Sequence, residues 1–260
     1  LVSDPALSLD TDRDTLPDKW ELGNNRDPLT PDYQVSVGGY HTCALDDFGV
    51  RCWGRNTSGQ TRPPALSLPA KVSGGNGHSC ALDDLGVQCW GSNEQGQTDV
   101  PALANPTQVS AGYDHTCALD DNGVQCWGDN NFGERDVPAL SGPTQVSVGD
   151  EHTCALDNNG VKCWGHNNFG QTDVPPLLNP IQVSAGITHT CALSDNGVQC
   201  WGNNNLGQTD VPALSNATQV SAGSNTCVID DNGVRCWGNN NFGQTDVPTL
   251  SHPTQVSAGF

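Results

Sequence analysis

Residues 108–128 read QVSAGYDHTCALDDNGVQCWG, and close copies of this stretch recur along the chain. The valine of Gln-Val-Ser, or of its variants, marks the start of each copy, at Val35, Val72, Val109, Val146, Val183, Val220 and Val256. The first five steps are 37 residues long and the last is 36. Six full units therefore run from about residue 32 to residue 253, and a seventh begins at residue 255.

Each unit contains three short segments with strand character, namely QVSAG, HTCAL and GVQCWG. Asp-Asp-Asn-Gly or a relative separates the last two, and Asn and Gly tolerate the positive φ of a hairpin turn. The tail GQTDVPAL contains proline and is expected to be a connecting arm rather than a central strand. No stretch has helical periodicity. The sequence predicts an all-β fold, a β-propeller of six or seven short antiparallel blades built from 37-residue repeats.

The twelve cysteines occur as one pair per unit. If Leu45 pairs with Val50 across a four-residue loop, Cys43 and Cys52 lie opposite each other on one face of the hairpin, within disulfide range. We therefore predict one intra-hairpin disulfide per repeat. The predicted pairs are Cys43–Cys52, Cys80–Cys89, Cys117–Cys126, Cys154–Cys163, Cys191–Cys200 and Cys227–Cys236.

A metal site is the main alternative to disulfides for these cysteines, and free thiols are a second alternative. A histidine stands two residues before the first cysteine in five units, at His41, His78, His115, His152 and His189. The sixth unit has Asn225 at this position and keeps both cysteines. A residue that asparagine can replace is better explained as a hydrogen-bonding group than as a metal ligand. The spacing also differs from that of structural zinc sites.

Other repeated residues have structural interpretations. The tryptophan after the second cysteine should pack against the next blade, with a ring of sugar-stacking platforms as the alternative. The asparagine that follows Trp-Gly-x, such as Asn130, should cap backbone groups of a turn. The aspartates of the hairpin turns and arms are expected to form a solvated acidic rim, and weak divalent-cation binding or a basic partner is the alternative.

Composition limits the function. The 260 residues carry a formal net charge of −19, which argues against binding to nucleic acid because phosphate contacts need clustered Lys and Arg. No apolar run is long enough to span a membrane. Disulfides would place the protein outside the cell, either secreted or at the cell surface. The chain lacks methionine and opens without a signal-like stretch, so we expect a mature or excised piece of a larger product.

The unit Gly-xx-His-Thr-Cys-Ala-Leu-Asp-Asp-Asn-Gly-Val-Gln-Cys-Trp-Gly-x-Asn-xx-Gly-Gln resembles the regulator of chromosome condensation repeat. It looks closest to the short bacterial form found in secreted beta-lactamase inhibitor proteins. The resemblance covers about 220 residues and implies a seven-bladed propeller with three-stranded blades. The cysteine pair departs from the family pattern. Seven first strands but six cysteine hairpins are present, so the seventh blade is expected either to be unfinished or to be absent from a six-bladed ring.

The N-terminal residues 1–34 are predicted to be an acidic calcium-binding segment, and residues 35–260 the propeller. Oxygen donors fall at the spacing of an EF-hand-like loop, at Asp10, Asp12, Asp14, Leu16, Asp18 and Glu21. Thr15 stands where glycine is expected, which should weaken Ca²⁺ binding. The wider segment resembles bacterial thrombospondin type 3 segments, and the resemblance implies that Asp27 and Asp32 help a second ion. The alternative is an acidic linker that binds nothing.

No catalytic cluster is visible, because the repeated Ser, His and Asp lie at equivalent positions one blade apart. The first hypothesis is a non-catalytic, exported scaffold that is ordered by Ca²⁺. It would assemble through the unfinished seventh repeat or with a protein partner, and filaments are one form that such an assembly can take. The alternative is a binding module, either a protein inhibitor or lectin-like, that uses loops on one face. Positions that vary between units are Tyr40, 76–77, 113–114, 150–151, 187–188 and Ser224.

Overall fold

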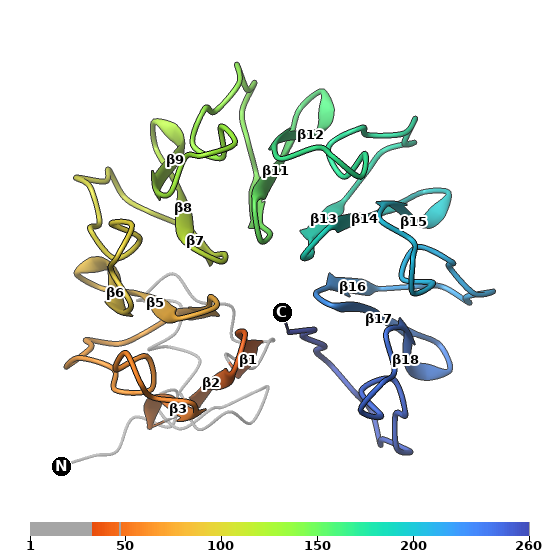
Figure 1. Ribbon diagram of the computed structural model, residues 1–260, viewed down its shortest axis with the longest axis horizontal. Coiled ribbons are helices and arrows are strands. Elements are labelled where there is room, and N and C mark those ends of the chain that lie inside the picture. The colour runs from red at the N-terminus through yellow and green to blue at the C-terminus, as the bar shows by residue number, and fades with distance from the viewer. Residues whose placement is uncertain (1–32, 47, 260) are drawn as a thin grey trace, which may run out of the picture.

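The computed structural model describes residues 33–46 and 48–259, in which eighteen strands form six separate three-stranded sheets. The sheets are arranged as blades around a common centre, each with its first strand innermost (Figure 1). Every sheet has the same order, because each repeat folds into one antiparallel meander. The predicted all-β propeller of 37-residue repeats is confirmed.

We number the blades 1 to 6 in chain order. The inner strands are β1 (Gln34–Val37), β4 (Lys71–Gly74), β7 (Gln108–Ala111), β10 (Gln145–Val148), β13 (Gln182–Ala185) and β16 (Gln219–Ala222). The middle strands are β2 (His41–Asp46), β5 (His78–Asp83), β8 (His115–Asp120), β11 (His152–Asp157), β14 (His189–Ser194) and β17 (Asn225–Asp230). The outer strands are β3 (Gly49–Gly54), β6 (Gly86–Gly91), β9 (Gly123–Gly128), β12 (Gly160–Gly165), β15 (Gly197–Gly202) and β18 (Gly233–Gly238).

The hairpin register agrees with the prediction. Leu45 pairs with Val50 and Cys43 with Cys52, and the same register holds in every blade. All six predicted disulfides are present. The four-residue loop was too long, because Asp46 still pairs with Gly49 and leaves two residues in the turn. Gly49 has a φ of +100°, as a tight hairpin turn requires.

Side chains of the inner strands join neighbouring blades around the centre. The backbone N–H of Val72 donates to Gln34 Oε1 at 2.8 Å, and that of Gly74 donates to Ser36 Oγ at 2.9 Å. The glutamine contact, the serine contact or both recur at every later junction. The repeated Gln-x-Ser motif therefore replaces the backbone pairing that separate sheets lack.

Residues 255–259 close the ring (Figure 1). On one side, Val256 N donates to Gln219 Oε1 at 2.8 Å. On the other side, Val35 N donates to Gln255 Oε1 at 2.7 Å. The segment thus fills a seventh inner position between blades 6 and 1. It is not an assigned strand, because the described residues supply no middle strand to pair with it.

The hydrophobic core lies between blades rather than at one centre. Leu119 and Val124 of blade 3 pack against Val146, Val148 and Trp164 of blade 4. Equivalent clusters occupy other junctions. Each blade therefore needs a neighbour on both sides to bury its apolar residues.

Candidate functional site

A repeated hydrogen-bond cluster binds the outer part of each blade to the preceding repeat. Between blades 1 and 2, His41 Nε2 lies 2.7 Å from Ser79 Oγ, which donates to the backbone carbonyl of Gln60 at 3.0 Å. The indole N–H of Trp90 donates to the same carbonyl at 2.8 Å. The predicted roles of histidine as a hydrogen-bonding group and of tryptophan as core are therefore confirmed at this junction. The cluster occurs at all five filled junctions.

Blade 1 has no preceding repeat among the described residues to form this cluster with its Thr42 and Trp53. The Trp53 side chain is 55 % exposed, whereas Trp90, Trp127, Trp164 and Trp201 are 6 to 9 % exposed. Within residues 33–46 and 48–259, neither the Trp53 indole N–H nor the Thr42 hydroxyl has a hydrogen-bond partner. The prediction that every repeated tryptophan is core is therefore wrong for Trp53, because it faces the seventh position.

The opposite side of this position is also incomplete. The backbone carbonyl of Gln244 corresponds to that of Gln60 but receives no indole or hydroxyl donor from the described residues. Phe242, two residues earlier, is 93 % exposed. We define the seventh position as the space bounded by residues 255–259, Thr42 and Trp53 of blade 1, and Gln244 of the sixth repeat.

Two tryptophan substitutions should separate a filled junction from the open one. Trp164→Ala should destabilise the chain by about 3–5 kcal/mol, since it removes a buried indole from a core. Trp53→Ala should change stability by about 0.5 kcal/mol or less, as for an exposed residue. Urea unfolding of both variants measures this difference, and equal destabilisation would show that Trp53 is buried in solution.

The loops after the inner strands and after the outer strands lie together on one side of the ring, which we call the variable face. The backbone N–H of Asp129 donates to the carbonyl of Asp114 at 2.8 Å, for example. Acidic side chains from blades 2 to 4 gather here. Burial, with the nearby carboxylates of Asp129 and Glu94, raises the pKa of Asp114. Burial, with Glu151 and Asp114, raises the pKa of Asp150 to about 7.

The raised pKa of Asp150 predicts that its charge opposes folding at neutral pH. The unfolded chain ionises this group near its ordinary pKa of 3.8. The free-energy penalty is therefore complete above about pH 7, decreases as the folded group is protonated between about pH 7 and 3.8, and is absent at lower pH. Asp150→Asn should raise the melting temperature at pH 7.5 by about 2–4 °C. Calorimetry at pH 7.5 and 4.5 should show a smaller gain at the lower pH, and the exposed Asp84→Asn should show neither effect. An equal gain at both pH values would contradict this assignment.

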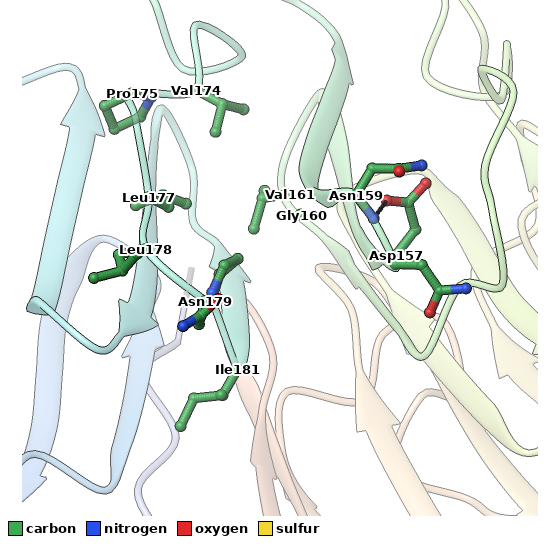
Figure 2. Close-up of a pocket in the computed structure, with 12 residues that line it drawn as sticks. Asp157, Asn159, Gly160, Val161, Val174, Pro175, Leu177, Leu178, Asn179 and Ile181 are labelled. Atoms are coloured by element: carbon green, nitrogen blue, oxygen red, sulfur yellow. Dashed lines mark hydrogen bonds between the residues drawn. The ribbon is translucent and has the colours of Figure 1, made fainter.

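Hollows also occur at the outer rim, between a hairpin turn and the arm that follows it. One of them has a volume of about 680 Å³ and lies in the fourth repeat. Leu177 and Leu178 of the arm face Asp157 and Asn159 of the turn across it (Figure 2). Similar hollows occur in the first and second repeats. They are features of the repeat and do not mark one blade as specialised.

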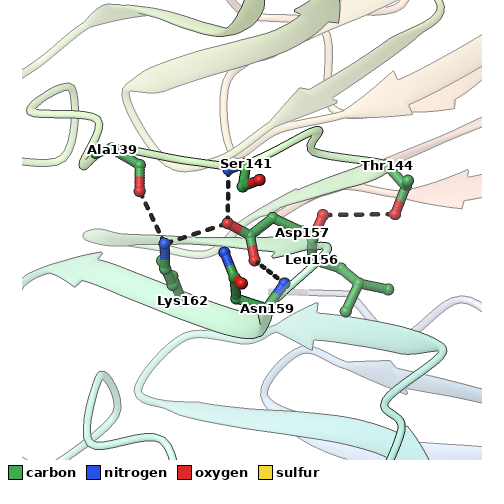
Figure 3. A network of polar contacts seen from close by, with 7 residues as sticks. All are labelled: Ala139, Ser141, Thr144, Leu156, Asp157, Asn159 and Lys162. Carbon is green, nitrogen blue, oxygen red and sulfur yellow. Dashed lines mark hydrogen bonds and ion pairs between the residues drawn. The ribbon is translucent and has the colours of Figure 1, made fainter.

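Asp157 shows that the predicted solvated acidic rim is partly wrong. Its carboxylate accepts hydrogen bonds from the backbone N–H groups of Ser141 at 2.8 Å and Asn159 at 2.7 Å, and pairs with Lys162 at 3.1 Å (Figure 3). Burial acts to raise the pKa of Asp157, but these contacts outweigh it and lower the pKa. The first turn aspartates of blades 2, 3, 4 and 6 are buried, because each fastens the arm of the preceding repeat to the hairpin of its own blade.

The arm asparagines cap turns as predicted. Asn130 Oδ1 accepts the backbone N–H of Arg135 at 2.8 Å, and its Nδ2 donates to Asp136 at 3.1 Å. No group of three or more His, Cys, Asp or Glu side chains within residues 33–46 and 48–259 could hold a metal ion. The predicted calcium ligands Asp10, Asp12, Asp14, Leu16, Asp18, Glu21, Asp27 and Asp32 lie outside the described residues, so calcium binding stays a prediction.

Comparison with known proteins identifies the repeat. The family model of the regulator of chromosome condensation (RCC1) repeat matches residues 33–60, 70–97, 107–134, 144–171, 181–208 and 217–244. The chain belongs to the RCC1-repeat family. No curated protein matches this RCC1-repeat chain.

Solved structures similar to this RCC1-repeat chain include two plant ectodomains. The CRINKLY WD40 ectodomain of the Arabidopsis thaliana receptor kinase ACR4 is 30 % identical, with a TM-score of 0.70 and 88 % of each chain covered. The ectodomain of the Physcomitrella patens receptor kinase CR4 is 28 % identical, with a TM-score of 0.71, and the match covers 88 % of this chain and 68 % of that one.

A more distant likeness concerns the fold alone. Prp20p from Saccharomyces cerevisiae is 20 % identical, with a TM-score of 0.68 and coverage of 82 % of this chain and 72 % of that one. Among the residues that the structure describes, no helix has the length and apolar character to cross a bilayer. The resemblance to the short bacterial form of the repeat stays a prediction.

Proposed function

We propose that this chain is a non-catalytic, extracellular protein-interaction module, and that its partner docks in the seventh position. The observation that carries the proposal is the exposure of Trp53, whose counterparts in blades 2 to 5 are buried by the preceding repeat. An exposed, mid-strand tryptophan beside an unpaired backbone segment is a typical anchor for an added β-element.

The five filled junctions define what the partner must supply. Towards blade 1 it needs a backbone carbonyl that accepts from Trp53 and Thr42, as Gln60 accepts from Trp90 and Ser79. It also needs an apolar strand to cover the half-buried Val35 and Ala44 of blade 1, which are less buried than their counterparts in other blades. An antiparallel β-hairpin of the repeat's own pattern meets both needs.

Two observations support an extracellular location. Every blade contains a disulfide, and six structural disulfides in one chain are typical of an oxidising compartment. The two structures that share 28 and 30 % identity with this chain are receptor-kinase ectodomains.

The test uses an oxidised synthetic peptide with the sequence of residues 189–208, which contains one disulfide hairpin and the turn that follows it. Calorimetric titration should show binding to the whole chain. Trp53→Ala should weaken it about 30-fold, the effect of losing an anchor worth about 2 kcal/mol. Phe48→Ala is the matched control, because Phe48 is exposed in the same blade but lies at the hairpin turn. No binding, or equal loss in both variants, would refute the docking site.

A second candidate function is favoured by the acidic pattern of residues 10–21, namely a calcium-ordered scaffold in which a second copy of this chain occupies the seventh position. The net charge of −19 makes copies repel each other, so Ca²⁺ neutralisation should promote their association. Light scattering on a sizing column, with Ca²⁺ and then with a chelator, followed by negative-stain imaging, should reveal calcium-dependent oligomers or filaments. A monomer in both conditions would reject self-assembly and leave the heterologous partner.

A further inference from the structure

A hollow of about 400 Å³ lies on the variable face at the junction of blades 5 and 6, away from Thr42, Trp53 and Gln244. It is lined by the side chains of Gln208, Asn203, Asn205 and Asn239 together with two aliphatic residues, Ile187 and Leu206. Its volume is within the range of small-molecule sites.

The hollow lies where the sixth repeat is one residue shorter than the others. Blade 5 has two residues between Gly186 and His189, whereas blade 6 has only Ser224 between Gly223 and Asn225. In blade 3 the corresponding position holds Asp114, whose carboxylate accepts a hydrogen bond from Gln97 Nε2 of the preceding arm at 2.8 Å. Blade 6 has no residue at this position.

The amide donor of Gln208 has no protein partner beside this shorter loop. Gln208 occupies the position of Gln97 and is only 5 % exposed. Its Oε1 accepts the backbone N–H of Leu206 at 2.9 Å, which fixes the orientation of the amide. Its Nε2 has no hydrogen-bond partner among the described residues, although the side chain lines the hollow. This donor borders the hollow, so a ligand bound there can accept a hydrogen bond from it.

From this arrangement we propose that the hollow binds one uncharged sugar unit of a saccharide. Sugar hydroxyls both donate and accept, which matches side-chain amides and the hydroxyls of Thr188 and Ser224 at the wall. The C–H faces of a sugar ring match the aliphatic side chains of Ile187 and Leu206. The proposal is independent of the partner at the seventh position.

The lining excludes other ligand classes. None of the lining residues carries a carboxylate, a guanidinium or an ammonium group. Burial lowers the pKa of His189 to about 4, so this residue is neutral at pH 7. A cation would favour the acidic side chains of blades 2 to 4, and an anion would find no positive partner. A peptide offers one donor and one acceptor per backbone unit, and so uses fewer of the clustered amides than a sugar ring does.

The test is saturation-transfer NMR of the whole chain with the methyl glycosides of glucose, mannose, galactose and N-acetylglucosamine. Gln208→Glu replaces the unpaired donor by an acceptor. The fold tolerates this residue, because Glu134 stands at the same repeat position, is buried, and accepts the backbone N–H of Phe132 at 2.9 Å. Gln60→Glu is the matched control, since Gln60 is equally buried but does not line the hollow.

At least one methyl glycoside should bind the wild-type chain with a millimolar Kd. Gln208→Glu should weaken this binding by about 10-fold or more. Gln60→Glu should leave it unchanged. Insertion of a threonine between Ser224 and Asn225, which restores the loop length of the other blades, should abolish it. Absence of binding by all four glycosides, or equal binding by wild type and Gln208→Glu, would overturn the proposal. N-acetylglycine N-methylamide is the peptide probe, and its binding in place of the glycosides would assign the hollow to a peptide instead.

Discussion

Acidification from pH 7 to pH 4 is expected to unfold the propeller, with most of the stability lost below pH 6.5. Four buried histidines carry the effect. Burial is the main cause that lowers the pKa of His78, His115 and His152 to about 3 and that of His189 to about 4, and neighbouring histidines lower the first three further.

The sign follows from proton linkage. The unfolded chain binds protons at these side chains near pH 6.5, while the folded chain excludes them until the pH approaches 3 to 4. Stability is therefore fully present above pH 6.5 and is lost as the pH falls through this window. At pH 5 each histidine opposes folding by about 2 kcal/mol, and the four together reach a large part of the roughly 5–15 kcal/mol that stabilises an ordinary domain.

Circular dichroism and calorimetry between pH 7.5 and 3.5 measure this loss. Protonation of Asp150 acts in the opposite direction, so Asp150→Asn should make the loss steeper. His152→Asn is the informative variant, because Asn225 occupies the same position in blade 6. It should reduce the acid sensitivity while it leaves the blade folded at pH 7.5. A melting temperature that does not change between pH 7 and 4.5 would show that the histidines are accessible to protons in the folded state.

Reduction of the six disulfides is expected to unfold the chain at neutral pH. Each disulfide closes a loop of about ten residues and is worth about 2–3 kcal/mol through the loop-closure entropy of the unfolded chain. The combined contribution, about 12–18 kcal/mol, is as large as or larger than the stability of a typical domain. Because Cys43, Cys80, Cys117, Cys154 and Cys191 are fully buried, reduction should be slow without denaturant and fast in moderate urea.

The measurement is circular dichroism after reduction in urea, alkylation and removal of the denaturant. The alkylated chain should remain unfolded, while an oxidised sample taken through the same urea treatment should refold. A reduced and alkylated chain that regains its sheet signal would show that apolar packing between blades suffices without the disulfides.

Much of the fold could be predicted because the repeat supplies six independent copies of each signal. The spacing of Cys43 and Cys52 around a Gly-containing turn fixes the register of one hairpin, and the same arithmetic then holds in every blade. The burial of Asp157 could not be predicted, because its partner Ser141 lies in the arm of the preceding repeat, and no pattern shows how that arm packs on the next hairpin.

The candidate sites depend on departures from the repeat, which are weak signals in a sequence. Trp53 has the same local sequence as the other tryptophans, and its exposure is decided by the missing neighbour rather than by the residue. The hollow beside Gln208 did leave a trace in the sequence, namely the 36-residue step. This signal does not show that Nε2 of Gln208 lacks a protein partner, because that depends on a contact between two repeats.

The seventh position is tested most directly by ¹⁹F NMR of the chain labelled with 5-fluorotryptophan, with Trp53→Phe used to assign the Trp53 resonance. Addition of the oxidised 189–208 peptide should shift that resonance and protect it from solvent, while the resonances of the buried Trp90, Trp127, Trp164 and Trp201 stay in place. A Trp53 resonance that does not respond to saturating peptide would contradict the account, because the peptide would then bind elsewhere or not at all.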